Sequence, residues 1–206
     1  MPRDKTYSHI KVNEAIKAEF LEKGFEGASI RSIGARAGMT SAGLYRHYKD
    51  KEDMFNAMVE PLIADIRKWT EHHISKKHEL SSRKVKGDDL FGESFVDLVR
   101  DVILPKKDEF RLLFACSAGT KYENFIHDYV EENQKAFVKA LVHLKKNGYP
   151  VKVIEEEELH MLLSAYLTAC FEPILHDYDA EKTDQYLNTL QDFFMPGWMK
   201  IMGIEN

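Results

Sequence analysis

Five residues at positions 41–47 have the types and spacing needed to contact nucleic acid. Hydroxyl, guanidinium and imidazole groups donate hydrogen bonds to phosphate oxygens and to base edges in the DNA grooves. The positions expected to project outward are Ser41, Gly43, Tyr45, Arg46 and His47. The apolar positions expected to pack inward are Ile30, Ile33, Ala37, Met39 and Leu44. This pattern favours a short helix that presents one face to DNA.

Residues 29–54 predict the elements that would hold these side chains in place. Gly38 supplies a left-handed backbone position that ends a first short helix. Thr40 is the expected side-chain cap of a second short helix, and a third helix begins at Lys51. Two short helices joined in this way form a helix-turn-helix, which sets its second helix into the major groove. An ordinary helical hairpin has a similar pattern, so the motif needs support from the surrounding charge.

The N-terminal quarter of the chain is basic and the remainder is acidic. Residues 1–51 hold ten Lys or Arg and six Asp or Glu, a net charge of +4. Residues 52–206 carry a net charge of −9. A basic head on an acidic body is expected when only the head meets nucleic acid.

Several short stretches match a known family in order and spacing. Glu22–Phe25 precedes the motif, Ala37–Gly38 occupies its turn, and Leu44–Tyr48 is followed by Lys51–Glu52. With these residues, the segment from about Val12 to Phe55 resembles the DNA-binding domain of TetR-type bacterial transcriptional regulators.

The resemblance implies a set of DNA contacts. The positions that would contact phosphate are Tyr45, His47 and Lys51, with Ser29 and Arg31 on the preceding helix. The positions that would enter the groove are Thr40, Ser41, Gly43 and Arg46. The partner would be double-stranded DNA carrying a palindromic operator, because a dimer reads two half-sites about 34–36 Å apart.

The rest of the chain has helical periodicity throughout, with proline and glycine as breaks. The expected class is all-α, with a three-helix head at 1–49 and a larger ligand-binding and dimerisation body at 50–206. A polar loop is expected at 78–87. The expected helices outside the motif are 8–23, 51–77, 88–104, 108–115, 120–147, 155–175 and 182–199.

The resemblance also implies a homodimer and a small-molecule effector. The last two helices would form the dimer interface. Residues 159–175, apolar on nearly every side, agree with this, although a buried core helix of a monomer would look the same. An effector pocket would lie among the helices of the body. Its candidate lining residues are Trp69, Phe95, Phe114, Tyr122, His127, Tyr166, Cys170 and Phe171.

Other classes of protein find little support in the sequence. His72, His73 and His78 are spaced by one and five residues, so they do not converge on one helix face, and we expect no metal or cofactor. No catalytic motif is present, so we expect no enzyme. The most apolar run, 159–171, is shorter than the roughly 20 residues of a bilayer span. Without a targeting pattern, and with two cysteines far apart, a cytoplasmic protein is expected.

The sequence therefore predicts a DNA-binding transcriptional regulator, a repressor that leaves its operator when an effector binds. The main alternative is a constitutive DNA-binding protein whose body binds another protein. An enzyme with a coincidental helical hairpin is the third class.

Overall fold

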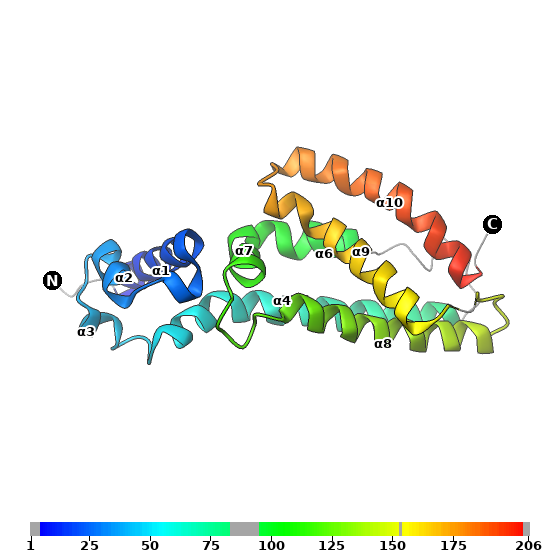
Figure 1. Cartoon of the computed structure of the whole chain (residues 1–206), viewed down its shortest axis with the longest axis horizontal. Coiled ribbons are helices and arrows are strands. Elements are labelled where there is room, and N and C mark those ends of the chain that lie inside the picture. The colour runs from blue at the N-terminus through cyan, green and yellow to red at the C-terminus, as the bar shows by residue number, and fades with distance from the viewer. Residues whose placement is uncertain (1–4, 83–94, 153, 204–206) are drawn as a thin grey trace. The chain divides into compact units, whose positions relative to one another are not determined.

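The computed structural model describes residues 5–82, 95–152 and 154–203, and every regular element in these ranges is a helix (Figure 1). This confirms the predicted all-α fold with a helix-turn-helix in its N-terminal part. In the same ranges, no helix combines the length and the apolar character needed to cross a lipid bilayer.

The helices pack into two compact units. The first takes in the described residues up to Ala64 together with Lys106–Phe125. The second takes in Asp65–Pro105 and the described residues from Ile126 onward. Packing therefore groups residues 106–125 with the N-terminal helices. Which stretch folds by itself is a separate property, so the expected domain boundary between residues 49 and 50 stays a prediction.

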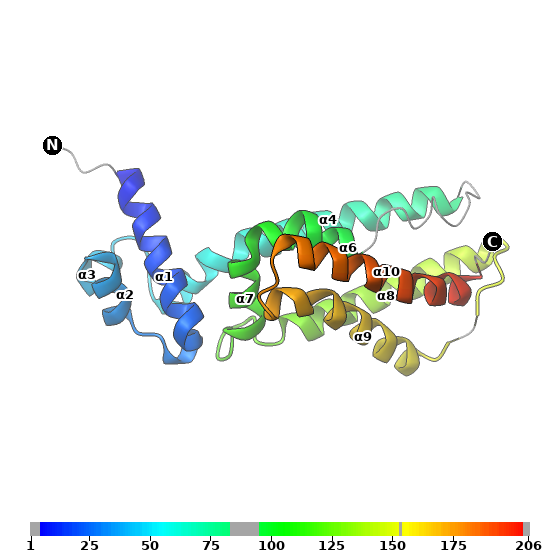
Figure 2. The ribbon, with the colours of Figure 1, turned by 90° about the horizontal axis from the view of Figure 1, so that it is seen from above.

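The first unit is built from α1 (Lys5–Gly27), α2 (Ile30–Ala37), α3 (Ser41–Leu44), the start of α4 (Lys51–Ser82) and α7 (Lys107–Ala115) (Figure 2). An apolar stripe at three- and four-residue spacing on α1 faces its core. Val12, Ile16 and Phe20 in this stripe are buried, and Phe20 packs edge-on against Phe55 of α4. Removing a side chain of this size from water contributes about 1.5–3 kcal/mol.

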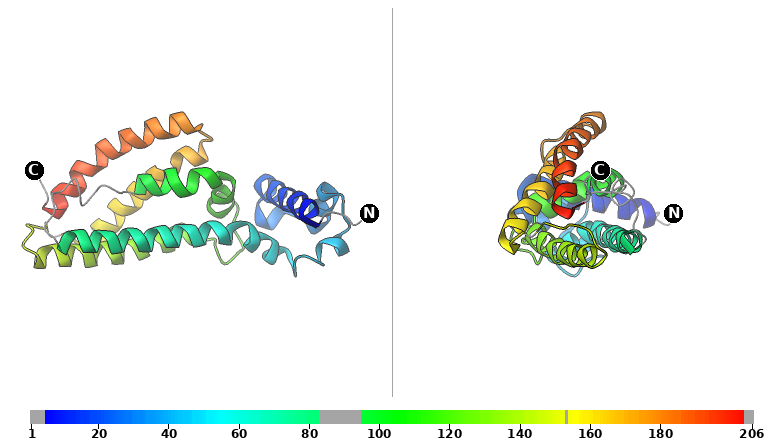
Figure 3. Two further views of the ribbon diagram at one scale, coloured as in Figure 1. Left: turned by 180° about the vertical axis from the view of Figure 1, so that it is seen from behind. Right: turned by 90° about the vertical axis from the view of Figure 1, so that its right-hand side faces the viewer.

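The second unit contains α6 (Phe95–Leu98), the π-helical turn η1 (Val99–Ile103), α8 (Phe125–Lys146), α9 (Glu156–Leu175) and α10 (Ala180–Met202). In this unit α10 turns back along α9 to form an antiparallel hairpin (Figure 3). The Arg100 guanidinium fastens η1 to α10, because it donates to Asp184 at 2.7 Å and to Asn188 at 2.5 Å. The second half of α4 meets α8 through the hydroxyls of Thr70 and Tyr129, 3.0 Å apart.

Some predicted helix ends are wrong. α4 continues to Ser82, so residues 78–82 of the expected loop are helical, and the remainder of that loop lies outside the described residues. α8 begins at Phe125 rather than at residue 120, because the Thr120 hydroxyl donates to the Ser117 carbonyl and accepts from the Tyr122 amide, which closes a separate turn. Of the helix expected at 88–104, only the part from Phe95 onward is described.

The last helix also runs further than its apolar pattern suggests, to Met202, where Gly203 ends it. Gly203 has φ 68°, and a Cβ on it would stand 2.4 Å from the carbonyl carbon and oxygen of Pro150. Beside this contact the Lys152 amide donates to the Ile201 carbonyl at 2.8 Å. The glycine therefore lets the end of α10 join the segment that precedes α9.

We expect Gly203→Ala to lower the free energy of unfolding by more than about 2 kcal/mol, because it combines a left-handed backbone with a backbone clash. Gly148→Ala is the matched control. Gly148 has φ 87° but open space around a Cβ, so only the backbone cost of about 1 kcal/mol is expected. Urea unfolding of the two variants measures the difference. Equal losses would show that the approach of Pro150 is unimportant.

Candidate nucleic-acid interface

The helix-turn-helix is closed by hydrogen bonds within a few residues of one another. The Ser29 hydroxyl accepts from the Ser32 amide at 3.1 Å and caps α2. Gly38 ends α2 with φ 68° and ψ 34°. The Thr40 hydroxyl accepts from the Gly43 amide at 3.1 Å and caps α3. The sequence-based predictions for the helix end at Gly38 and the cap at Thr40 are thus confirmed.

The two faces of the motif are divided as the residue types predict. Ile33, Ala37 and Leu44 are buried, while Ile30 and Met39 are half-buried against the same core. Among the predicted contact residues, the exposed ones are Ser29, Arg31, Thr40, Tyr45, Arg46 and His47, and the half-buried ones are Ser41, Gly43 and Lys51. Tyr45 leaves 52% of its surface exposed, a large aromatic surface for a residue outside any core.

Tyr48 fixes the chain directly after this exposed run. Its ring is buried, and its hydroxyl donates to the Asn13 side chain of α1 at 2.6 Å. Burial raises the pKa of the Tyr48 phenol, and the Asp53 carboxylate raises it further. With Leu44 buried on one side and Tyr48 on the other, residues 45–47 are left to point outward.

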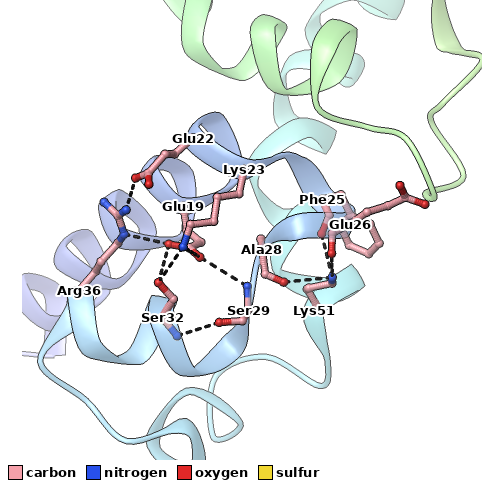
Figure 4. Close-up of polar contacts among 10 residues, drawn as sticks. All are labelled: Glu19, Glu22, Lys23, Phe25, Glu26, Ala28, Ser29, Ser32, Arg36 and Lys51. Atoms are coloured by element: carbon pink, nitrogen blue, oxygen red, sulfur yellow. Dashed lines mark hydrogen bonds and ion pairs between the residues drawn. The ribbon is translucent and has the colours of Figure 1, made fainter.

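A buried carboxylate joins α1 to α2. Glu19 is fully buried, and one of its oxygens accepts from the Ser32 hydroxyl at 2.7 Å and from Arg36 Nε at 2.9 Å (Figure 4). The other accepts from Lys23 Nζ at 2.9 Å and from the Ser29 amide at 3.5 Å. Ser29, the N-terminal cap of α2, is therefore held by the Glu19 carboxylate of α1.

These contacts determine the charge state of Glu19. Burial acts to raise its pKa, but hydrogen bonds from Ser32, Lys23, Arg36 and the Ser29 amide outweigh burial and lower the pKa from 4.5 to about 2. A negative charge is also favourable at the N-terminal end of α2 because of the helix dipole. Glu19 is thus ionised in the folded protein at neutral pH.

The same cluster engages two cations that the sequence counts toward a basic head. Arg36 pairs with Glu22 as well as Glu19, and these two hydrogen bonds raise the pKa of its guanidinium. Lys23 pairs with Glu19. Two of the ten Lys and Arg residues at 1–51 are therefore committed to carboxylates of the chain, and the net charge of +4 already includes these pairs.

Lys51 has an internal role in addition to the predicted phosphate contact. Its ammonium donates to the carbonyls of Phe25 at 2.7 Å, Glu26 at 3.3 Å and Ala28 at 3.2 Å (Figure 4). It also lies 4.5 Å from the centre of the Phe25 ring. Three hydrogen bonds use all the donors of an ammonium. Lys51 therefore fastens α4 to the junction of α1 and α2, and its contact with phosphate stays a prediction.

Residues 106–125 brace α1 and the start of α4 within the first unit. Lys17 pairs with Glu109 at 2.5 Å, and the Phe25 amide donates to the Cys116 carbonyl at 2.9 Å. Glu60 accepts from Lys121 at 3.1 Å and from the Tyr122 hydroxyl at 3.0 Å, and these bonds lower the pKa of Glu60.

The structure brings together three of the eight predicted ligand-contact residues. In the second unit the ring of Phe95 lies 6.3 Å from Trp69 and 6.1 Å from Tyr166. Tyr129 and Trp198, which the sequence analysis did not select, extend this aromatic cluster at 6.3 Å from Phe95 and 6.1 Å from Tyr166 respectively. We call these five residues the aromatic cluster.

The remaining five predicted ligand-contact residues are placed differently. Phe171 is buried on α9, and so is Cys170, which lies against Tyr166 of the aromatic cluster. Burial raises the pKa of the Cys170 thiol to about 12, although a hydrogen bond with Tyr166 lowers it, so the thiol stays protonated. The His127 side chain is 62% exposed. Phe114 and Tyr122 belong to the first unit. No three potential metal ligands converge in the described residues, and the side chain of His78 lies outside them.

Sequence reasoning missed Glu19, although a signal for it exists. It stands in the apolar stripe of α1, seven residues after Val12 and three after Ile16, where a carboxylate would be buried. A charge at a core position requires partners. The partners at Ser32 and Arg36 could not be identified from spacing, because they lie on another helix.

Comparison with known proteins gives a family match for the N-terminal residues and similarities to solved structures. Residues 14–58 match the sequence model of the family described as "Bacterial regulatory proteins, tetR family". The fold is similar to that of MexZ, described as a key repressor responsible for antibiotic resistance in Pseudomonas aeruginosa, with 16% identity, 96% of each chain covered and a TM-score of 0.52. NalD of the same organism, the secondary repressor of the MexAB-OprM multidrug efflux pump, matches with 17% identity, 94% of this chain and 97% of NalD covered, and a TM-score of 0.48.

We expect Glu19→Gln to destabilise the protein by about 3 kcal/mol at neutral pH, because the donors around the carboxylate lose a buried charge. Since folding lowers the pKa of Glu19 from 4.5 to about 2, its contribution is complete above pH 4.5 and is lost as the pH falls toward 2. The gap between wild type and variant should therefore shrink at pH 3.

Urea unfolding followed by circular dichroism at pH 7 and pH 3 measures this gap. Glu22→Gln is the control, because that carboxylate pairs with Arg36 but is 56% exposed, and its loss should cost less than about 1 kcal/mol. Equal effects of the two variants would rule out a special role for the buried carboxylate.

Proposed function

We propose, from the match of residues 14–58 to the tetR family of bacterial regulatory proteins, that this chain is a transcriptional repressor that binds operator DNA as a homodimer and leaves it when a small molecule binds. The observation that carries this proposal is the capped α2–α3 motif. It buries Leu44 and Tyr48 while Tyr45, Arg46 and His47 remain exposed.

We assign the DNA contacts by exposure and chemistry. The N-terminal end of α3, with Thr40, Ser41 and Gly43, would enter the major groove, and Arg46 would read a base or turn to phosphate. Phosphate contacts come from the exposed hydroxyls, imidazole and guanidinium of Ser29, Tyr45, His47 and Arg31. Lys51 would act mainly by holding the motif together.

The dimer would form through α9 and α10. These helices carry large apolar side chains that face away from the core, with Met161 63% exposed and Phe193 77% exposed. Pairing such faces around a two-fold axis buries both copies at once, since each subunit offers the same patch. A dimer also supplies two recognition helices for an inverted repeat.

The effector would act by shifting a population of subunit arrangements. A ligand that binds better to an arrangement unable to span both half-sites lowers the affinity for DNA. The aromatic cluster of the second unit supports a planar or apolar ligand. A dimer that binds its operator constitutively and shows no thermal shift with any compound of a broad library would instead favour a body that binds another protein.

Selection of bound sequences from random duplex DNA, with purified full-length protein at physiological salt, tests the proposal. Enrichment of an inverted repeat supports a sequence-specific dimer. Weak, salt-sensitive binding with no enriched sequence would contradict operator recognition by the free protein. Addition of candidate ligands to the enriched duplex then tests release.

Tyr45→Ala should weaken binding about fivefold on any duplex, since one phosphate hydrogen bond is worth about 1 kcal/mol. Ser41→Ala should instead change the ranking of duplexes that differ at one base pair. Tyr178→Ala, which removes a 41% exposed tyrosine from the second unit, is the control and should bind like wild type. Gel shifts at moderate salt measure all three. Wild-type affinity of Tyr45→Ala would argue strongly against the assigned surface.

Phe193→Asp should convert the dimer to monomers at micromolar concentration, because a charge replaces the most exposed apolar side chain of α10, and loss of a central aromatic contact weakens association at least about tenfold. Light scattering coupled to size-exclusion chromatography measures the mass. Val142→Asp, at a 49% exposed position of α8, should leave the dimer intact. If both variants kept the mass of a dimer, the interface would lie elsewhere than at Phe193.

A further inference from the structure

Two histidines far apart in the sequence meet beside the proposed recognition surface. His9 of α1 and His47 after α3 have ring centroids 4.7 Å apart and planes inclined by 81°. Both side chains are exposed. An edge-to-face contact of this kind is a favourable aromatic geometry.

The contact is fixed by buried neighbours of each histidine. One helical turn after His9, Asn13 accepts the Tyr48 hydroxyl at 2.6 Å, and Leu44 and Tyr48 on either side of His47 are buried. These anchors set the distance between α1 and residues 44–48. His9 is therefore held next to His47.

No carboxylate of the described residues pairs with either imidazole. The nearest charged residues in sequence, among those whose side chains the structure describes, are Lys11 and Glu14 after His9, and Arg46, Lys49 and Asp50 around His47. Asp50 accepts from the Asp53 amide at 2.8 Å, and Asp53 accepts from the Lys49 amide at 2.9 Å, so both carboxylates are committed to the start of α4. Three of these sequence neighbours are cations, and Glu14 is the one carboxylate among them without such a bond.

We propose that His9 and His47 form a proton-dependent phosphate contact, in which His9 positions the His47 ring and both imidazoles gain protons when DNA binds. This inference rests on the proposed DNA-binding function. Histidine is the side chain that ordinarily changes charge between pH 5 and pH 8. Two adjacent imidazolium rings repel each other, and a phosphate beside them removes that repulsion. Linkage then requires DNA affinity to rise as the pH falls.

The test compares the affinity of the full-length protein for its selected duplex at pH 8 and pH 6, at constant ionic strength, by fluorescence anisotropy. Wild type should bind roughly fivefold more tightly at pH 6, below the limit of tenfold per pH unit for one proton. His9→Phe keeps an aromatic edge at this position but takes up no proton, so it should lose at least half of the pH effect. His47→Phe should do the same.

His72→Gln is the matched control, because His72 is an exposed histidine of the second unit and should leave the pH effect unchanged. Full pH dependence in His9→Phe would overturn the inference. So would wild type that binds equally at both pH values, an outcome that leaves the DNA-binding function standing. Absence of binding at both pH values would contradict the function itself.

Discussion

The orientation of the recognition motif depends on one buried negative charge. Glu19 draws donors from α1 and from the first two turns of α2, so the angle between these helices is fixed by hydrogen bonds as well as by apolar contact. Such a cluster is sensitive to the loss of any member, because a buried charge without partners is strongly destabilising. α3 follows α2 after three residues and inherits this orientation.

Internal pairing also determines how strongly the N-terminal unit can attract DNA. Lys23, Arg36 and Lys51 have their charges directed at carboxylates or carbonyls of the chain. Arg31 and Arg46, in contrast, have no ion pair with a described residue. Since each cation placed on phosphate releases counterions, a small set of free cations gives a shallow dependence of affinity on salt.

The second unit combines a dense interior with several large apolar side chains on its surface. Tyr129 illustrates the interior: burial raises the pKa of its phenol to about 12, although Thr70 and Asn133 lower it through hydrogen bonds. Phe193 illustrates the surface, since it lies on the same helix as buried Trp198 but points away from the core. One helix thus packs against the core on one face and exposes a large apolar side chain on another.

Features whose causes lie within a few residues can be predicted from the sequence. Ser29 and Thr40 cap the starts of α2 and α3, and Gly38 ends α2, through bonds to residues three or four positions away. The burial of Ile33 and Leu44 follows from the helical period. The tertiary fold supplies the remaining partners of Glu19 beyond Lys23, and the carbonyl partners of Lys51, which lie 10 to 26 residues away. It also decided that Tyr122 joins the first unit while Trp69 joins the second. This is because the residue type determines which bonding partners a side chain requires, whereas the packing of distant helices determines which neighbour provides them.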